Sequence, residues 1–221
     1  MKRGWSSATP PRDSEGGSEP DAPDAGSAEA ERNVGLPTRR SRQLVYSNDW
    51  ITVHEDQLIY AHDRPGIYGV VSKSDFSLVI PVLSGMIGLI RQYRYPIATW
   101  KLEFPQGSAS ESTPQESMLH VAQRELREES GLTASRLWFL GFFHESYGLG
   151  PSTCHVFLAD VEASALPSPE YTEILSEPVW SSPKEFWRYV ASGDISDGPS
   201  IAAMGLAFQP ANADLRESLG L

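Results

Sequence analysis

Short stretches in which apolar and polar residues alternate fill the chain from residue 43 to residue 93, and they predict a series of β-strands. β-branched and aromatic residues are frequent in these stretches, as is usual where one face of a sheet is buried. The predicted strands cover residues 44–46, 51–55, 57–62, 68–72, 78–83 and 86–93. Turn-forming sequences lie at residues 63–66 and 84–85. The pattern is typical of a β-meander.

The spacing of the apolar residues changes between residues 113 and 131, where they recur every three or four positions. One apolar stripe contains Leu119, Ala122 and Leu126. This periodicity predicts an amphipathic helix of about four and a half turns. A capping box marks its start, with Thr113 as the N-cap, Pro114 in the first turn and Glu116 three residues after the cap. Gly131 follows the last turn, where a left-handed residue is common.

Three glutamates lie on one arc of this helix, beside the apolar stripe: Glu125, Glu128 and Glu129. Carboxylates at these spacings repel by roughly 0.2–0.5 kcal/mol per pair, so a positive charge is expected among them. Arg124 can neutralise Glu128, which leaves the charges of Glu125 and Glu129 uncompensated. Clustered carboxylate oxygens suit a hard divalent cation such as Mg²⁺ or Mn²⁺. The alternative is a solvated helix face, and the glutamates alone do not distinguish the two.

The flanking residues favour the cation site, because they match a family pattern. From Gly107 to Leu132 the sequence resembles the Nudix box of the Nudix hydrolases. In that box a glycine and a glutamate precede Arg-Glu-aliphatic-x-Glu-Glu-x-Gly-aliphatic; Gly107, Glu116 and residues 124–132 match these parts. Eight residues separate Gly107 from Glu116, where the family usually has five. The additional residues fall in a Ser/Thr-rich loop, where an insertion costs little.

Two further segments narrow the resemblance to the ADP-ribose pyrophosphatase branch of these hydrolases. Residues 91–94 read Arg-Gln-Tyr-Arg, and residues 103–107 read Glu-Phe-Pro-Gln-Gly. By this resemblance Arg94 lies near the substrate and Glu103 lines the metal site. A guanidinium suits bidentate binding of phosphate; the alternative for Arg94 is a surface position on a strand. Nearby aromatic residues are candidates for stacking on a nucleobase, or for core positions: Tyr93, Tyr95 and Trp100.

At the position where this branch often has its general base, the sequence departs from the family pattern. The branch often has a glutamate three residues before the histidine that opens a strand after the box. Here that histidine is His155, and the position three residues earlier holds Ser152, which cannot act as a base. Glu145, at the other end of the same glycine-containing loop, and Glu103 are the candidates. A glutamate of the helix acting directly is a third interpretation.

The resemblance implies a Nudix fold, an α/β/α sandwich with a central mixed sheet and helices on both sides. It also implies metal-dependent hydrolysis of the pyrophosphate bond of a nucleoside diphosphate such as ADP-ribose or a nucleotide sugar. The predicted catalytic residues are Glu125, Glu128, Glu129 and Glu145. The predicted ligands of Mg²⁺ or Mn²⁺ are Gly107, Glu125, Glu128 and Glu129. The predicted substrate-binding residues are Arg94 and Glu103.

Composition divides the chain of 221 residues into three parts. Residues 1–42 are rich in Ser, Pro, Gly, Ala and charged residues, which predicts a disordered tail. Residues 43–208 form the predicted Nudix domain, with a strand from residue 178 and helices over residues 183–191 and 199–208. Residues 209–221 are either a frayed helix or a tail. The net charge of −11 argues against nucleic acid as the main partner.

Location and assembly are predicted less directly. No stretch of about eighteen apolar residues predicts a membrane span, and the N-terminus lacks the apolar core of a signal peptide. Cys154 is the one cysteine, which fits a reducing compartment, and a cytoplasmic location is expected. Members of this branch commonly pair through N-terminal strands, so the resemblance implies a homodimer.

Other functional classes compete with this prediction. A non-catalytic sensor of nucleotide sugars on the same fold would explain Ser152, but its helix carboxylates should be eroded, and they are intact. A hydrolase of nucleoside triphosphates or of a coenzyme is the other alternative, because the box determines the chemistry and not the leaving group. A purely structural domain is weaker, because it has no need of an acid cluster beside a core stripe.

Overall fold

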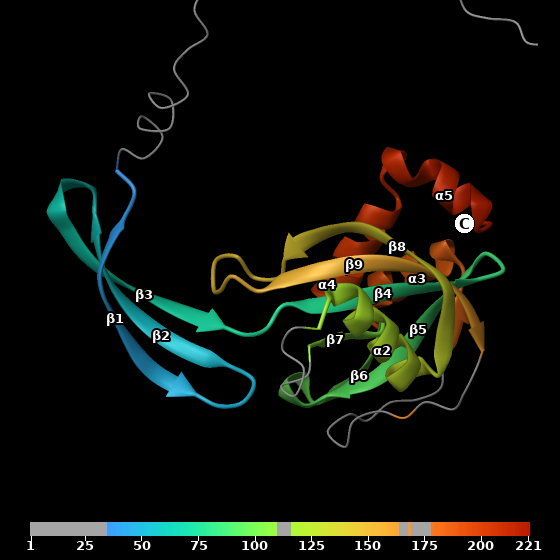
Figure 1. Ribbon diagram of the computed structural model, residues 1–221, viewed down its shortest axis with the longest axis horizontal. Coiled ribbons are helices and arrows are strands. Elements are labelled where there is room, and N and C mark those ends of the chain that lie inside the picture. Colours follow the sequence, from blue (N-terminus) through green and yellow to red (C-terminus); the bar gives the residue numbers. More distant parts are fainter. Residues whose placement is uncertain (1–34, 110–115, 164–167, 169–177) are drawn as a thin grey trace, which may run out of the picture.

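The computed structural model describes residues 35–109, 116–163, 168 and 178–221. These residues form a body, in which helices lie on both sides of one mixed sheet, and a three-stranded sheet that projects from it (Figure 1). The α/β/α arrangement predicted from the sequence is confirmed.

Seven strands form the sheet of the body in the order β10-β5-β4-β9-β8, with β6 paired to β5 and β7 paired to β4. Their bounds are β4 Phe76–Leu83, β5 Met86–Arg94, β6 Thr99–Glu103, β7 Gln106–Ser108, β8 Leu132–His144, β9 Thr153–Ala163 and β10 Val179–Ser181. Strands β4 and β9 are parallel, and the other pairs are antiparallel. Nearly all of β4 is buried, because helices cover both of its faces.

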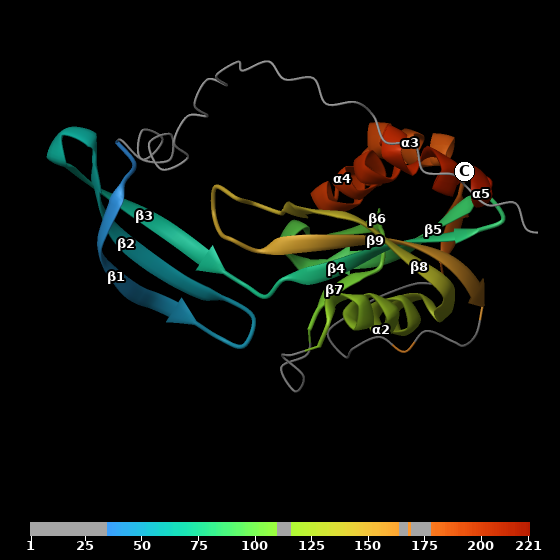
Figure 2. The ribbon, with the colours of Figure 1, turned by 45° about the horizontal axis from the view of Figure 1, so that its top comes forward.

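Helix α2 covers one side of the sheet, and α3 and α4 cover the other (Figure 2). The α-helices are α2 Met118–Ser130, α3 Pro183–Ser192, α4 Gly198–Ala207 and α5 Ala213–Ser218. Short 3₁₀ turns occur at η1 Ala61–Asp63, η2 Tyr95–Ile97 and η3 Pro210–Asn212. Within the described part of the chain, no helix is long and apolar enough to cross a membrane.

Two apolar cores hold these layers together. Under α2, Ala122 and Leu126 pack with residues of β4 and β9 such as Val79. On the opposite side, Phe186 of α3 and Met204 of α4 pack in a larger core that also contains Leu78, Ile80, Leu102, Phe104 and Cys154. Cys154 is fully buried, and burial raises the pKa of its thiol.

Three antiparallel strands form the projecting sheet, called the arm below: β1 Thr38–Ser47, β2 Thr52–Tyr60 and β3 Arg64–Ser72. The arm extends from the end of the body that lies opposite the C-terminus (Figure 1). Arg42 of β1 holds the buried Asp56 of β2 with two hydrogen bonds of 2.7 Å. Every residue of β1 is exposed, including its apolar ones.

The N-terminal boundaries differ from the sequence prediction. Strand β1 begins at Thr38, so residues 38–42 pair with β2 and are not part of a disordered tail. Both faces of this part of β1 are exposed, so its residues are mostly polar. The sequence therefore contains no apolar alternation here from which a strand could be predicted. Residues 51–55 and 57–62 were predicted as two strands, but β2 is continuous to Tyr60 and the chain reverses at η1. Residues 1–34 lie outside the described residues.

Helix α2 begins later than predicted. Ser117 is the N-cap, and its side chain accepts a hydrogen bond from the backbone N–H of His120. Glu116 therefore precedes the helix and takes no part in a capping box, whereas Thr113 and Pro114 lie outside the described residues. The Ser-Thr-rich sequence offers several candidate N-caps, so the residue types alone did not identify the right one.

The buried face of α2 is also rotated from the predicted stripe. Leu119 is 42% exposed, because the first turn of the helix is only partly covered. The buried residues are Val121, Ala122, Glu125, Leu126, Glu129 and Ser130. Two of the glutamates thus lie within the buried arc and not beside it. Gly131 ends the helix with a left-handed φ of 70°, as predicted.

The C-terminal elements agree with the prediction at residues 178–208, where β10, α3 and α4 occur. Beyond them, α5 decides between the two alternatives left open by the sequence. Residues 213–218 form a helix, and Leu215, Leu219 and Leu221 pack against the larger core. The C-terminal residues are therefore part of the packed body.

Candidate active site

The loop that connects β6 to β7 passes the buried face of α2. Phe104 is fully buried, and the carbonyl oxygen of Pro105 accepts a hydrogen bond from the backbone N–H of Val79 at 3.0 Å. Residues Gln106–Ser108 then pair with β4 as strand β7. These contacts fix the loop to the centre of the sheet.

Glu125 and Glu129 meet this loop from α2 and are almost fully buried, at 6% and 1% exposed. The backbone N–H of Gln106 donates a hydrogen bond to Glu129 Oε2 at 2.8 Å. Gly107 lies directly against Glu125, because a Cβ atom at this glycine would be 2.3 Å from Glu125 Cδ. Three residues predicted for the metal site are thus brought together, and the glycine is required by the close approach.

Arg124 lies among the acids of α2. Its Nη1 is 2.8 Å from Glu125 Oε1 and 2.9 Å from Glu128 Oε2, and its Nη2 donates to the carbonyl of Ser108 at 2.6 Å. The expectation that Arg124 leaves Glu125 uncompensated is wrong, because the broad guanidinium contacts both acids. Burial disfavours the charged form of Arg124, but Glu125 and Glu128 outweigh it and raise its pKa.

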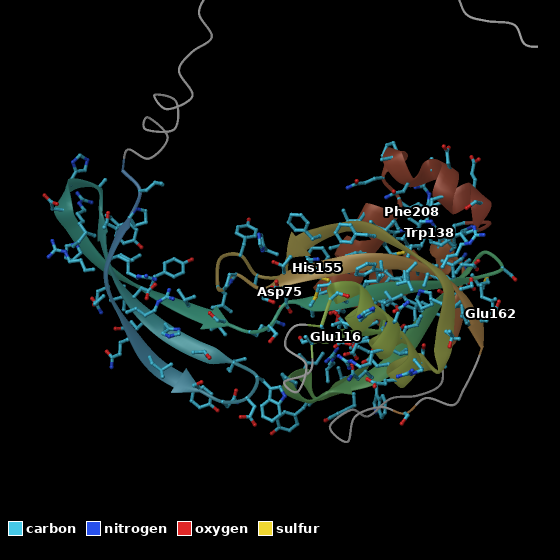
Figure 3. All side chains as sticks on the ribbon, viewed as in Figure 1. Asp75, Glu116, Trp138, His155, Glu162 and Phe208 are labelled. Atoms are coloured by element: carbon cyan, nitrogen blue, oxygen red, sulfur yellow. The ribbon has the colours of Figure 1, made fainter. Side chains whose placement is uncertain are left out.

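The cluster has oxygen donors and an excess of negative charge, and both features suit a divalent cation. Glu116, at the start of α2 in Figure 3, is 3.5 Å from Arg124 Nε, and its buried Oε2 has no hydrogen-bond partner among the described residues. Three carboxylates, the other two being Glu125 and Glu128, therefore surround one guanidinium. Within the described ranges, no three acidic, histidine or cysteine side chains already converge on one point.

Arg94 and Glu103 form a partly buried ion pair beside this cluster. Arg94 Nε donates to Glu103 Oε2 at 2.9 Å, and Nη2 donates to Oε1. Glu103 is 1% exposed, whereas 40% of the Arg94 side chain is exposed. Burial raises the pKa of Glu103, and Arg94 opposes that rise. For Arg94, burial is outweighed by Glu103, with smaller contributions from Asp197 and Glu129, and its pKa is raised.

Asp197 at the start of α4 is a neighbour that the sequence prediction missed. Its Oδ2 accepts hydrogen bonds from the backbone N–H of Ser200 at 2.8 Å and from Gln106 Nε2 at 3.3 Å. A local signal for the first contact was present, since an aspartate two residues before Pro199 is a typical helix N-cap. No local signal indicates the contact with Gln106.

Glu145, the other candidate base, belongs to a separate group of contacts. It begins the loop of residues 145–152 and is 2.5 Å from Lys73 Nζ, with 28% of its side chain exposed. A hollow of about 220 Å³ beside the loop is lined by both residues and by Ser152. Ser152 is buried and donates to the carbonyl of Ser74 at 3.2 Å, which is a structural role.

The same loop is attached to strand β3 of the arm. The backbone N–H of Val71 donates to the Leu149 carbonyl at 2.9 Å, and the Tyr68 hydroxyl donates to the Gly148 carbonyl at 2.6 Å. Gly150 approaches so closely that a Cβ atom there would lie 1.8 Å from the Val71 carbonyl oxygen. The arm and the loop therefore pack as one unit.

Comparison with known proteins identifies the class to which this fold and site belong. Residues 76–203 match the model of the NUDIX domain, and the chain therefore belongs to the NUDIX family. An ADP-ribose pyrophosphatase of Bacillus subtilis (strain 168) is 30% identical over 146 residues, which are 64% of this chain and 71% of the relative. A crystal structure of an ADP compounds hydrolase shares the fold, with a TM-score of 0.70 and 21% identity over 84% of this chain and 97% of that one.

Within the family, the chain is ADP-ribose pyrophosphatase-like. It is a Nudix pyrophosphohydrolase, an enzyme that hydrolyses acid anhydrides of phosphorus. The resemblance to the Nudix hydrolases, inferred from the Nudix box at Gly107–Leu132, is therefore confirmed.

Proposed function

We propose that this chain hydrolyses the pyrophosphate bond of a nucleoside diphosphate joined to another group, with Mg²⁺ or Mn²⁺ as cofactor. ADP-ribose or a nucleotide sugar is the substrate, and the products are a nucleoside monophosphate and a sugar phosphate. The observation that carries the proposal is the buried pair Glu125 and Glu129, which meets Gly107 and the Gln106 N–H inside a NUDIX domain. The Bacillus subtilis relative, an ADP-ribose pyrophosphatase, supports the choice of substrate.

The carboxylates of α2 would hold the cation. Glu125, Glu128 and Glu129 would supply side-chain oxygens, and Gly107 its carbonyl oxygen, which are the donors that Mg²⁺ and Mn²⁺ prefer. A bound divalent cation screens the diphosphate and lowers the pKa of a bound water. Burial excludes bulk water from Glu125 and Glu129, which strengthens their attraction for positive charge. Arg124 keeps the acids together at a spacing that would otherwise repel.

Arg94 is proposed to bind phosphate oxygens of the substrate. Its hydrogen bonds to Glu103 fix the plane of the guanidinium, and part of the side chain faces solvent. A guanidinium has five N–H donors, so an arginine that holds a carboxylate retains donors for a phosphate. Exposed aromatic residues on the neighbouring hairpin suit stacking on a nucleobase: Tyr95 and Trp100.

Glu145 is the proposed general base. Both carboxylate oxygens of Glu103, the other candidate, are bound by Arg94, and its burial leaves water little access. Glu145 is partly exposed and lines the hollow beside its loop. The loop position and the access to water therefore favour Glu145 for accepting a proton.

A panel of substrates tests the proposed reaction. The full chain is incubated with ADP-ribose, nucleotide sugars, dinucleotides and nucleoside triphosphates, each with Mg²⁺, Mn²⁺ or a chelator, and the products are separated by chromatography. We expect nucleoside monophosphate to form from ADP-ribose or nucleotide sugars, and only when metal is present. Turnover of triphosphates or a coenzyme alone would reassign the substrate class. Binding of ADP-ribose without any turnover would contradict hydrolysis and support a sensor.

The arm supports a proposal on assembly, namely a homodimer that forms through β1. Leu44, Val45 and Tyr46 are 57%, 60% and 51% exposed, and contiguous exposed apolar residues commonly mark an interface. Light scattering should give twice the chain mass of 24.3 kDa. Val45→Glu should give the monomer mass, because an interface does not readily bury an unpaired charge. Gln209→Glu, which adds the same charge at an exposed residue outside the arm, is the control. A dimeric Val45→Glu would contradict the proposal.

A cytoplasmic location completes the proposal. The only cysteine in the sequence, Cys154, is buried and free, which fits a reducing compartment. Separation of cell fractions, followed by detection of the chain, tests this location.

A further inference from the structure

The side chain of Asp197 joins helix α4 to the loop between β6 and β7. Its Oδ2 accepts a hydrogen bond from the Ser200 backbone N–H, which makes it the N-cap of α4. The same oxygen accepts a hydrogen bond from Gln106 Nε2. An N-cap satisfies a donor of its own helix, so the second contact gives Asp197 a role beyond α4.

A second contact from the same helix turn strengthens this connection. The backbone N–H of Phe104 donates to Ser200 Oγ at 3.0 Å, and both residues are fully buried. The first turn of α4 therefore holds the loop at two points, the backbone at Phe104 and the side chain at Gln106.

Gln106 carries the connection across the sheet to α2. Its side chain reaches Asp197, while its backbone N–H donates to Glu129 Oε2 at 2.8 Å. The next residue, Gly107, packs against Glu125. Helices α4 and α2 lie on opposite sides of the sheet (Figure 2), so the contacts form a continuous path from one helix layer to the other.

We propose that Asp197 is a positioning residue: through Gln106 it fixes the place of Glu129 and thereby sets the affinity of the carboxylate cluster for a divalent cation. Partners of this kind orient the groups that contact a metal and influence its affinity. The inference rests on the proposed function, because it needs Glu129 to hold a cation.

The hydrogen bonds of Asp197, and not its charge, are the feature that acts in this proposal. An asparagine at this position retains a carbonyl oxygen that can accept from both Ser200 and Gln106. An alanine retains neither bond. Asp197→Asn should therefore restore what Asp197→Ala removes, which a role based on charge would not allow.

Binding of Mn²⁺ to the full chain, measured by calorimetry without substrate, tests the proposal. Asp197→Ala should weaken Mn²⁺ binding about 10-fold or more, the size of effect seen for partners of metal ligands. Asp197→Asn should bind Mn²⁺ as the native chain does. Gln106→Ala, which keeps the backbone N–H to Glu129 but loses the side-chain contact, should also weaken binding.

Ser182→Ala is the matched control. Ser182 is the N-cap of α3, and its side chain accepts from the Glu185 backbone N–H at 3.2 Å. Its loss should lower the Tm as the loss of a cap does, with unchanged Mn²⁺ affinity.

The outcomes separate this inference from the proposed function. If the native chain binds no Mn²⁺, the proposed cation site is wrong and the positioning role falls with it. If the native chain binds Mn²⁺ and Asp197→Ala binds it equally, with a Tm lowered as in Ser182→Ala, Asp197 is only a helix cap. If Asp197→Ala does not fold, Gln106→Ala decides, and native affinity in that variant overturns the inference.

Discussion

Glu129→Gln is expected to lower kcat/KM for ADP-ribose at least about 100-fold, because even the outer partners of metal ligands are commonly worth 10–100-fold. The change removes one negative charge from a side chain that is 1% exposed. Glutamine retains a carbonyl oxygen that can accept the hydrogen bond from the Gln106 N–H. The variant should therefore fold normally and lose its metal-dependent turnover. Steady-state kinetics with Mg²⁺ and with Mn²⁺ measure the loss, and thermal melting checks the fold.

Glu162→Gln is the control for this loss of charge. Glu162 is exposed near the end of β9, and Figure 3 places it at the right-hand edge of the body, away from Glu116. It should leave turnover unchanged, since no part of the proposed site depends on it. Undiminished turnover in a folded Glu129→Gln variant would remove this residue from the site.

Gly107→Ala is expected to have the second large effect. The new Cβ atom would lie 2.3 Å from Glu125 Cδ, so the carboxylate or the loop must move. A displacement of about 1 Å at a catalytic site costs roughly 100-fold in rate, and overpacking costs roughly 1–3 kcal/mol of stability. We expect kcat/KM to fall by about two orders of magnitude on these grounds. Kinetics measure the rate, and thermal melting measures the stability.

Gly69→Ala provides the comparison for this glycine. A Cβ atom at Gly69 in the arm would meet nothing within 4 Å, so the same substitution should leave the site unchanged. Native kinetics in Gly107→Ala would show that Glu125 does not need its present place. Such a result would show that the close approach of Gly107 to Glu125 is not needed for a cation site.

Local signals predict the helix that carries the acids. The spacing of Glu125 and Glu129 places both on one arc, and Gly131 marks the helix end without reference to any other segment. Gly107 was identified through its family pattern, and the structure gives the physical reason for it, namely the space taken by Glu125. The mixed sheet with helices on both sides was predicted through the resemblance to the family, and the structure confirms it.

Contacts between distant segments could not be predicted from local patterns. Gln106 and Asp197 are 91 positions apart, and no residue type near either one identifies its partner. The exposure of Leu119 depends on how much of the first turn of α2 is covered, which its periodicity does not record. Strand β1 was missed at residues 38–42 for a related reason: a strand exposed on both faces has no apolar alternation to detect.

The attachment of the Glu145 loop to strand β3 couples the position of Glu145 to the conformation of the arm. Val71 and Tyr68 bind the loop backbone, and Gly150 leaves no room for a side chain between the two segments. A change in the conformation of the arm would therefore displace the segment that contains Glu145.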